Sequence, residues 1–94
     1  MSLETVRDEI GRLDEEIIAL IAKRQRLANK IAHLKFEARI PIHDEAQKRT
    51  VLERVFNQAV ESHINPIPVR QIFEILIEMS EERQRECSGD GNLP

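Results

Sequence analysis

The chain has 94 residues with only three aromatic side chains, all Phe, and a formal net charge of -3 although 33% of its residues are charged. Acidic and basic residues are interleaved, so the composition excludes the concentrated basic surface of a nucleic-acid-binding protein. The core must come from Leu, Ile, Val and Ala, which favours helix packing. A chain this short buries little surface unless a second chain covers it.

No segment is typical of membrane insertion or export. The longest uncharged apolar run, IIALIA at 17–22, is far too short to span a bilayer. The N-terminal residues lack the basic-then-apolar order of a leader. A lone cysteine, Cys87, excludes an intrachain disulfide framework, and we interpret it as an incidental thiol near a frayed end. We therefore expect a cytoplasmic protein that binds neither membrane nor nucleic acid.

The first part of the chain has the strongest pattern. Apolar residues recur in steps of three and four from Leu3 to Leu34, and only Arg24 departs from the pattern. This heptad repeat predicts one helix over about residues 3–37, roughly 50 Å long. The rest of the chain cannot cover such a helix, which therefore needs a partner. Its apolar seam consists of Leu3, Val6, Ile10, Leu13, Ile17, Leu20, Leu27, Ile31 and Leu34.

A second helix is expected after the break in IPIHDEAQKRT, residues 40–50. The first helix should stop before Pro41, because the residue preceding a proline disfavours helical backbone angles. Asp44 suits the N-cap of the second helix, which should run to about His63. The apolar face of this helix consists of Val51, Leu52, Val55, Phe56, Ala59 and Val60.

A third helix should follow the break INPIP at 64–68 and end near Cys87. Its inward face consists of Val69, Ile72, Phe73, Leu76 and Ile77. The sequence thus predicts an all-α fold with three helices per chain, the N-terminal one long, in a domain over residues 1–87. The remaining residues, 88–94, are expected to form a disordered tail.

Arg24 lies where the seam of the first helix requires an apolar side chain. It could reach solvent along its aliphatic stem or pair with a buried carboxylate. Lys35 is eleven residues further on, about 20° around the helix from Arg24, so the two cations share a face. Two cations on one apolar face, with no evident acid between them, indicate an anionic ligand.

The inward stripe of the third helix becomes polar toward its C-terminal end, where Ser80 and Gln84 continue the spacing of Phe73 and Ile77. These residues are either the frayed end of a helix or part of a polar pocket wall. In the second case, the cations of that pocket come from the first helix.

Arg7 cannot reach the same site within one chain. It lies seventeen residues before Arg24, roughly 25 Å away along the helix and about 100° around it. In an antiparallel or crossed dimer, the partner helix could bring its own Arg7 to the site.

Other kinds of site have little support. His33, His43 and His63 are too scattered for a metal-ligand pattern and should face solvent, and we interpret His43 as incidental. No serine stands in a nucleophile elbow and no glycine-rich loop could hold phosphate, so covalent catalysis is not expected. Cations with neutral donors instead fit electrostatic stabilisation of a positioned carboxylate substrate.

Taken together, these residues resemble the all-helical class of chorismate mutases, small intertwined homodimers of the shikimate pathway. The resemblance covers almost the whole chain. It is carried by VRDEIGRLDEEIIALIAKR at 6–24, Lys35, IPIHD at 40–44, VLERV at 51–55 and IFEILIEMSEERQ at 72–84. Single pieces are common in helices, but the ordered set of Arg, Arg, Lys, Asp, Ser and Gln at these spacings is specific.

The resemblance implies conversion of chorismate to prephenate, a pericyclic rearrangement with no cofactor and no covalent intermediate. It implies that Arg24 and the partner subunit's Arg7 hold the two carboxylates of the substrate. It also implies that Lys35 and Gln84 donate hydrogen bonds to the ether oxygen of the breaking bond.

Recognition of the ring hydroxyl departs from the family pattern. The resemblance implies that Ser80 assists at a carboxylate and that Asp44 lies near the hydroxyl. The family usually has Asp-x-x-Arg-Glu here, with the Glu accepting from the hydroxyl, but this chain has Gln47 and Lys48. Lys48 could pair with Asp44, contact the hydroxyl, turn to solvent or add a cation to the pocket.

Two alternatives to a homodimeric chorismate mutase with shared active sites remain. An enzyme on the same scaffold could act on isochorismate or aminodeoxychorismate, and the altered hydroxyl-reading positions motivate this alternative. A non-catalytic helical dimerisation module could also keep the scaffold, although such a module has no need for cations in its seam.

Overall fold

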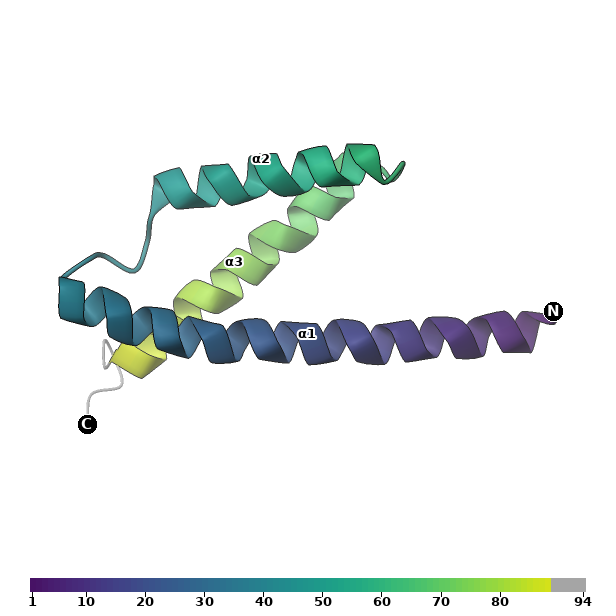
Figure 1. The fold of residues 1–94 in the computed structure, drawn as a ribbon, viewed down its shortest axis with the longest axis horizontal. Helices are drawn as coiled ribbons and strands as arrows, with labels where there is room; N and C mark the ends of the chain where they lie inside the picture. The colour runs from purple at the N-terminus through teal and green to yellow at the C-terminus, as the bar shows by residue number, and fades with distance from the viewer. Residues whose placement is uncertain (89–94) are drawn as a thin grey trace.

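The computed structural model describes residues 1–88, except for the side chain of Ser88. These residues form three α-helices and no strand (Figure 1), which confirms the predicted all-α class. The third helix ends at Ser88. The rest of the predicted disordered tail, residues 89–94, lies outside the described part of the chain.

α1 runs over Leu3–Ala38, which confirms the predicted long N-terminal helix. The Ser2 side chain caps its start by accepting a hydrogen bond from the backbone N–H of Thr5 at 3.1 Å. Arg39 caps the C-terminal end of the helix, and its left-handed backbone (φ 58°) turns the chain away two residues before Pro41. Its N–H still bonds to carbonyls of the last turn, so the helix end is satisfied.

α2 runs over Glu45–Glu61. The predicted cap is confirmed, because the Asp44 carboxylate accepts a hydrogen bond from the backbone N–H of Gln47 at 3.0 Å. The helix ends two residues before the predicted His63, which has a φ of 60° and cannot continue a right-handed helix.

α3 runs over Pro66–Ser88. The predicted break INPIP was too long, because its two prolines begin the helix instead of preceding it. Proline fits the first helical turn, where its missing N–H would have had no partner in any case. Asn65 supports this start by accepting a hydrogen bond from the backbone N–H of Ile67 at 3.0 Å.

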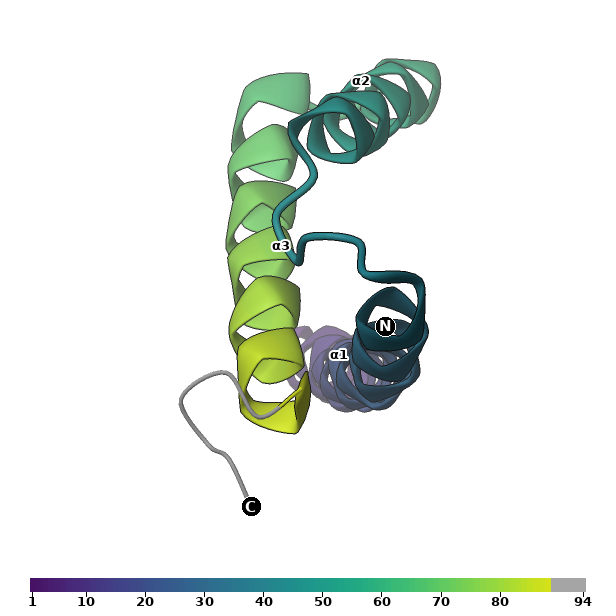
Figure 2. The same cartoon turned by 90° about the vertical axis from the view of Figure 1, so that its left-hand side faces the viewer.

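α3 packs against both other helices, whereas α1 and α2 do not contact each other. Figures 1 and 2 show that α3 begins at the C-terminal end of α2 and crosses to the C-terminal half of α1. α1 and α2 therefore lie apart, joined by α3. The N-terminal half of α1 extends beyond the other two helices, and the molecule measures 54 × 28 × 16 Å. None of the described helices has a stretch that is both long and apolar enough to cross a membrane.

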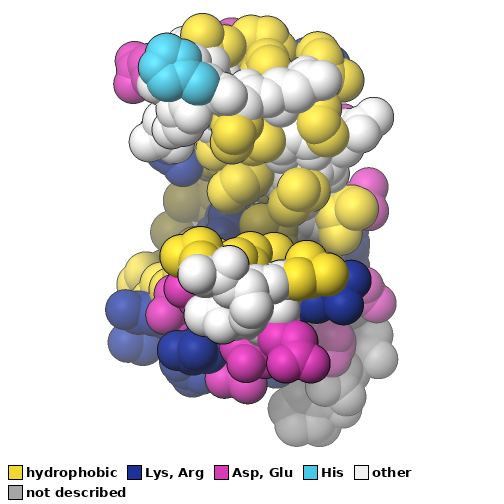
Figure 3. Space-filling model, turned by 90° about the vertical axis from the view of Figure 1, so that its right-hand side faces the viewer, with side chains coloured by type: hydrophobic (Ala, Val, Ile, Leu, Met, Phe, Trp, Pro, Cys, Tyr) yellow, Lys and Arg dark blue, Asp and Glu magenta, His cyan; other side chains and the backbone are white. Residues whose placement is uncertain are grey.

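The core is small because only α3 joins the other two helices. Its buried apolar side chains are Ala28, Ala32, Val51, Val55, Ala59 and Leu76. The predicted seam of α1 is left bare, since eight of its apolar residues are between 40% and 65% exposed. Val60 and Ile72, expected to face inward, are 52% and 55% exposed, because nothing in the single chain covers them. In Figure 3, hydrophobic side chains lie on the side of α1 that is turned toward the other two helices. Charged side chains lie on its opposite side.

Candidate active site

A cavity of about 530 Å³ lies between α1, the α1–α2 loop (residues 39–44), α2 and α3. Isoleucine and valine side chains from all of these segments form its apolar part: Ile31, Ile40, Ile42, Val51 and Ile77. The sequence predicted that one chain contributes six residues to its active site, and all six line this cavity: Arg24, Lys35, Asp44, Lys48, Ser80 and Gln84. The structure therefore brings together residues that lie up to sixty positions apart in the sequence.

Arg24 is half-buried and turned toward α3 rather than toward solvent. Its Nη1 donates a hydrogen bond to the Leu76 carbonyl at 3.4 Å, and its guanidinium carbon lies 5.8 Å from the centre of the Phe73 ring. No carboxylate within residues 1–88 pairs with it, which removes the buried ion pair considered from sequence. The contacts with α3 fix the guanidinium and leave most of its N–H donors for a ligand.

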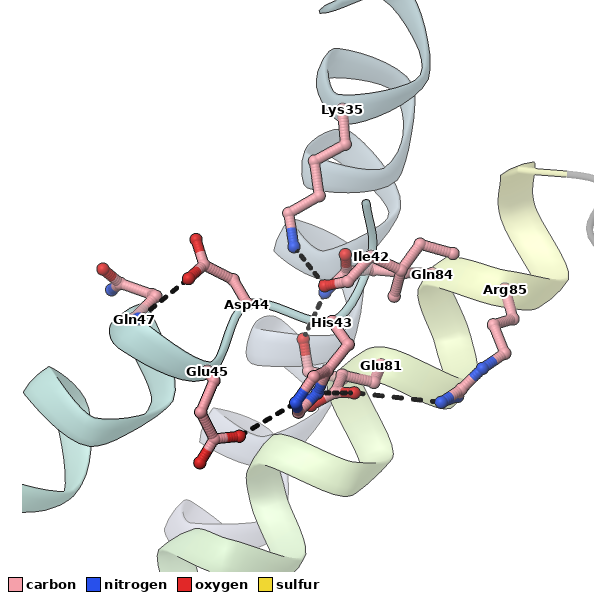
Figure 4. A network of polar contacts seen from close by, with 10 residues as sticks. Lys35, Ile42, His43, Asp44, Glu45, Gln47, Glu81, Gln84 and Arg85 are labelled. Atoms are coloured by element: carbon pink, nitrogen blue, oxygen red, sulfur yellow. Dashed lines mark hydrogen bonds and ion pairs between the residues drawn. The ribbon is translucent and has the colours of Figure 1, made fainter. Parts of the chain in front are cut away.

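Lys35 also lines the cavity and lies on the same side of α1, about three helical turns after Arg24. Its Nζ donates a hydrogen bond of 2.6 Å to the backbone carbonyl of Ile42 in the α1–α2 loop (Figure 4). An ammonium group has three donors, so this contact fixes the position of the charge without exhausting its capacity.

Gln84 is the one buried polar residue among the described side chains, with 4% of its surface exposed. Its Nε2 donates a hydrogen bond to the Ser80 hydroxyl oxygen at 3.0 Å, while its Oε1 is buried without a partner in the described chain. An unsatisfied buried carbonyl costs about 1–3 kcal/mol, so this amide needs an explanation other than stability. The alternative of a frayed helix end is wrong here, because α3 is helical through both residues.

The start of α2 contributes a carboxylate and a cation. One oxygen of Asp44 is occupied by the N-cap hydrogen bond to Gln47. Lys48 is half-buried and lines the cavity, so it does not simply turn to solvent. Within the described residues it forms no ion pair with Asp44, although the two lie four residues apart on one helix face.

A polar network links the α1–α2 loop to α2 and α3 beside the cavity. The His43 ring contacts a carboxylate oxygen of Glu81 and one of Glu45, each at 2.9 Å. Glu81 also lies 3.8 Å from Arg85, one turn further along α3 (Figure 4). The hydrogen bonds with Glu81 and then Glu45 raise the pKa of His43 above its usual value, because both favour the protonated ring. The prediction that His43 faces solvent is confirmed, since its side chain is 53% exposed.

Two charged residues of the cavity were missed from sequence. Arg54 of α2 lines it three residues after Val51, and Glu81 of α3 lines it one residue after Ser80. Helix periodicity could have found Glu81, which follows Ile77 by four residues on the same stripe. Arg7 is exposed on the extended half of α1 and is not among the lining residues, as expected for one chain.

The cavity is suited to an anion with an apolar body. Among the described residues, four cations line it (Arg24, Lys35, Lys48 and Arg54), against the two carboxylates of Asp44 and Glu81. Within residues 1–88 no group of three His, Cys, Asp or Glu side chains is arranged to hold a metal ion. Cys87 is a half-buried thiol that donates a hydrogen bond to Asn29 at 2.8 Å, which ties α3 to α1 rather than marking a frayed end.

Comparison with known proteins gives a consistent result. A family model described as chorismate mutase type II matches residues 6–85. The chorismate mutase of Methanocaldococcus jannaschii is 31% identical over 84 residues, which cover 89% of this chain and 85% of that protein. The bifunctional chorismate mutase/prephenate dehydratase of Buchnera aphidicola subsp. Schizaphis graminum is 31% identical over 97% of this chain, and that of Escherichia coli K12 is 31% identical over 83%. The matches span only 25% and 20% of these two bifunctional proteins.

Proposed function

The chain belongs to the chorismate mutase type II family, and we propose that it converts chorismate to prephenate, on the route to phenylalanine and tyrosine, in the cavity described above. The observation that carries the proposal is the lining of one cavity by Arg24, Lys35 and the buried amide of Gln84. A cytoplasmic site of action, expected from the sequence, belongs to the same proposal.

The shape and charge of the cavity fit chorismate. This substrate has two carboxylates on an otherwise largely apolar ring and enolpyruvyl arm. Arg24 would hold one carboxylate, because its planar guanidinium matches two carboxylate oxygens and its contacts with Leu76 and Phe73 already fix its direction. Ser80 also lines the cavity, and its single O–H can donate either to a carboxylate or to the Gln84 amide, but not to both.

The reaction breaks a carbon–oxygen bond while a carbon–carbon bond forms, so negative charge develops on the ether oxygen. Lys35 supplies a compact positive charge at the cavity, held by the Ile42 carbonyl. Gln84 supplies a neutral donor if its amide flips about the Cγ–Cδ bond, which exchanges the positions of Nε2 and Oε1. The Ser80 hydroxyl then donates to Oε1, and Nε2 takes the place of the unpaired oxygen. Donors that strengthen as charge develops favour the transition state over the bound substrate.

Catalysis would then need no nucleophile and no cofactor. The flexible enolpyruvyl arm must lie over the ring before the two carbon atoms can bond. The cations that hold the carboxylates and the ether oxygen perform this positioning, so its entropic cost is met before the reaction begins.

Lys48 bears on which substrate the cavity prefers. It lies in the cavity one turn after Asp44, at the position from which the family usually reads the ring hydroxyl. Isochorismate carries its hydroxyl on a different ring carbon, so an ammonium in place of a carboxylate could change the preferred isomer. Chorismate is the substrate we propose, and isochorismate is the competitor that this observation favours.

We further propose that two chains form a homodimer with two shared active sites. The bare apolar seam of α1 exposes more hydrophobic side chains than a stable monomer of this size would. The N-terminal half of α1 carries Arg7 away from its own cavity. Packing of this half against a second chain would bury the seam and bring the partner subunit's Arg7 to the second carboxylate.

The test is turnover by the purified chain, expressed in a host that lacks its own chorismate mutase. Loss of chorismate absorbance with prephenate as the identified product is the expected result. Isochorismate and aminodeoxychorismate are assayed in parallel, and turnover of isochorismate alone would contradict the proposal. A folded dimer that converts none of the three would instead indicate a non-catalytic dimerisation module.

A further inference from the structure

The α1–α2 loop is held at two consecutive residues by two different helices. The Ile42 carbonyl accepts the hydrogen bond from Lys35 of α1, and the next residue, His43, contacts Glu81 of α3 (Figure 4). The Ile42 carbonyl and the Cα atom of His43 belong to one planar peptide unit, so a contact that anchors the His43 residue also restrains the Ile42 carbonyl. The contact of His43 with Glu81 therefore helps to hold the loop backbone to which the Lys35 ammonium is bonded.

No other contact holds the Lys35 ammonium within the described chain. Its only hydrogen bond there is to the Ile42 carbonyl, at 2.6 Å. A lysine has a long and flexible side chain, so a single short contact decides which of its conformations puts the charge in the cavity.

Glu81 gives the contact with His43 a second consequence. The side chain of Glu81 is only 15% exposed and lines the same cavity. An unopposed carboxylate there would repel an anionic substrate. His43 on one side and Arg85 on the other offset that charge.

We propose that His43 is a positioning residue for the rearrangement: by holding Glu81, it fixes the Ile42 carbonyl and thereby the Lys35 ammonium in the cavity. The inference rests on the proposed function, since Lys35 acts on the ether oxygen only in that reaction. It gives His43 a role that the sequence did not suggest.

The charged groups around His43 determine how the contact responds to pH. They are Glu45 on α2, Glu81 on α3 with Arg85 beside it, and Lys35 of α1 one residue away through the Ile42 carbonyl. The pKa of His43 is raised in the folded protein, mainly by Glu81. The ion pair is therefore complete below the usual histidine pKa and is lost as the pH rises through the raised value.

The experiment compares kcat and KM across pH for the full chain and for His43→Ala, His43→Gln and Glu81→Gln. His33→Gln is the control, because His33 is an exposed histidine of α1 outside the cavity. We expect the wild type and the control to lose kcat as His43 deprotonates. His43→Ala should have about a two- to fivefold lower kcat at low pH, in keeping with the weak coupling of exposed ion pairs, and should lack this pH-dependent loss. His43→Gln, whose amide still donates to Glu81 but does not titrate, should recover part of the loss and be independent of pH.

Glu81→Gln should lower kcat as His43→Ala does, and the double variant should lose no more than either alone, since both act through one contact. A His43→Ala protein with wild-type kcat, or one that keeps the pH-dependent loss, would overturn the proposal. A change in KM alone would also overturn it, because displacement of Lys35 should act on the chemical step. Failure of the wild type to convert chorismate would instead refute the proposed function, which is a separate and recognisable outcome.

Discussion

Replacing Lys35 with alanine removes the charged donor that we place at the ether oxygen. The structure shows an ammonium held at 2.6 Å from the Ile42 carbonyl, with its other N–H donors available to a ligand in the cavity. Loss of one donor aimed at a developing oxyanion costs about 10²–10³ in kcat, or about 2.7–4 kcal/mol. We expect the upper end for Lys35→Ala, because a charged donor is stronger than a neutral one. Gln84 would remain as the second donor and account for the residual rate.

The same substitution also has a structural cost that must be separated from the catalytic one. The lost hydrogen bond to Ile42 is half-buried and should lower the free energy of unfolding by about 1 kcal/mol. Lys35→Gln keeps a neutral donor for that carbonyl, so it should recover much of the stability while kcat stays low. Lys30→Ala is the control, because Lys30 is an exposed lysine of the same helix outside the cavity.

The assay is initial-rate loss of chorismate, with urea unfolding and the oligomeric state measured on each variant. Lys30→Ala should match the wild type in all three measurements. A folded Lys35→Ala dimer that keeps kcat within about threefold of the wild type would refute a role for Lys35 in the chemical step.

Three further changes test other parts of the account. Gln84→Glu should confine activity to low pH, because only a protonated carboxyl can donate to the ether oxygen; a pH profile like that of the wild type would exclude this donor role. Lys48→Glu should change the ratio of kcat/KM between chorismate and isochorismate, and an unchanged ratio would mean that Lys48 does not contact the ring hydroxyl. Leu76→Ala removes a buried core side chain of α3 and should lower the free energy of unfolding by about 2–4 kcal/mol in urea titration. A loss well under 1 kcal/mol would show that this small core is not what holds the helices together.

The helices could be predicted well from sequence because their signals are local. The three-and-four spacing of the seam predicted the extent of α1, and the capping carboxylate of Asp44 predicted where α2 begins. The start of α3 was misplaced because prolines can either precede a helix or form its first turn, and the sequence favours neither.

The candidate site was predictable where polar residues interrupt an apolar pattern. Arg24 lies in the seam of α1 and Gln84 on the inward stripe of α3, and both line the cavity. The network of His43 and Glu81 was not predictable, because periodicity says which face of a helix a residue occupies but not which loop residue reaches it. The role of the Ile42 carbonyl had no sequence signal at all, since every residue has a backbone carbonyl.

A second chain would explain two features of the structure. It would cover the exposed seam of α1, and it would bring Arg7, which does not line its own cavity, to the cavity of the partner. The most direct measurement therefore mixes two inactive variants, Arg7→Ala and Arg24→Ala, under conditions of subunit exchange. With random exchange, about half of the dimers are mixed, and each of these contains one site with both arginines and one with neither. We predict that chorismate turnover returns to about one quarter of the wild-type rate per chain. No recovery, with mixed dimers confirmed by mass spectrometry, would contradict an active site shared between two chains.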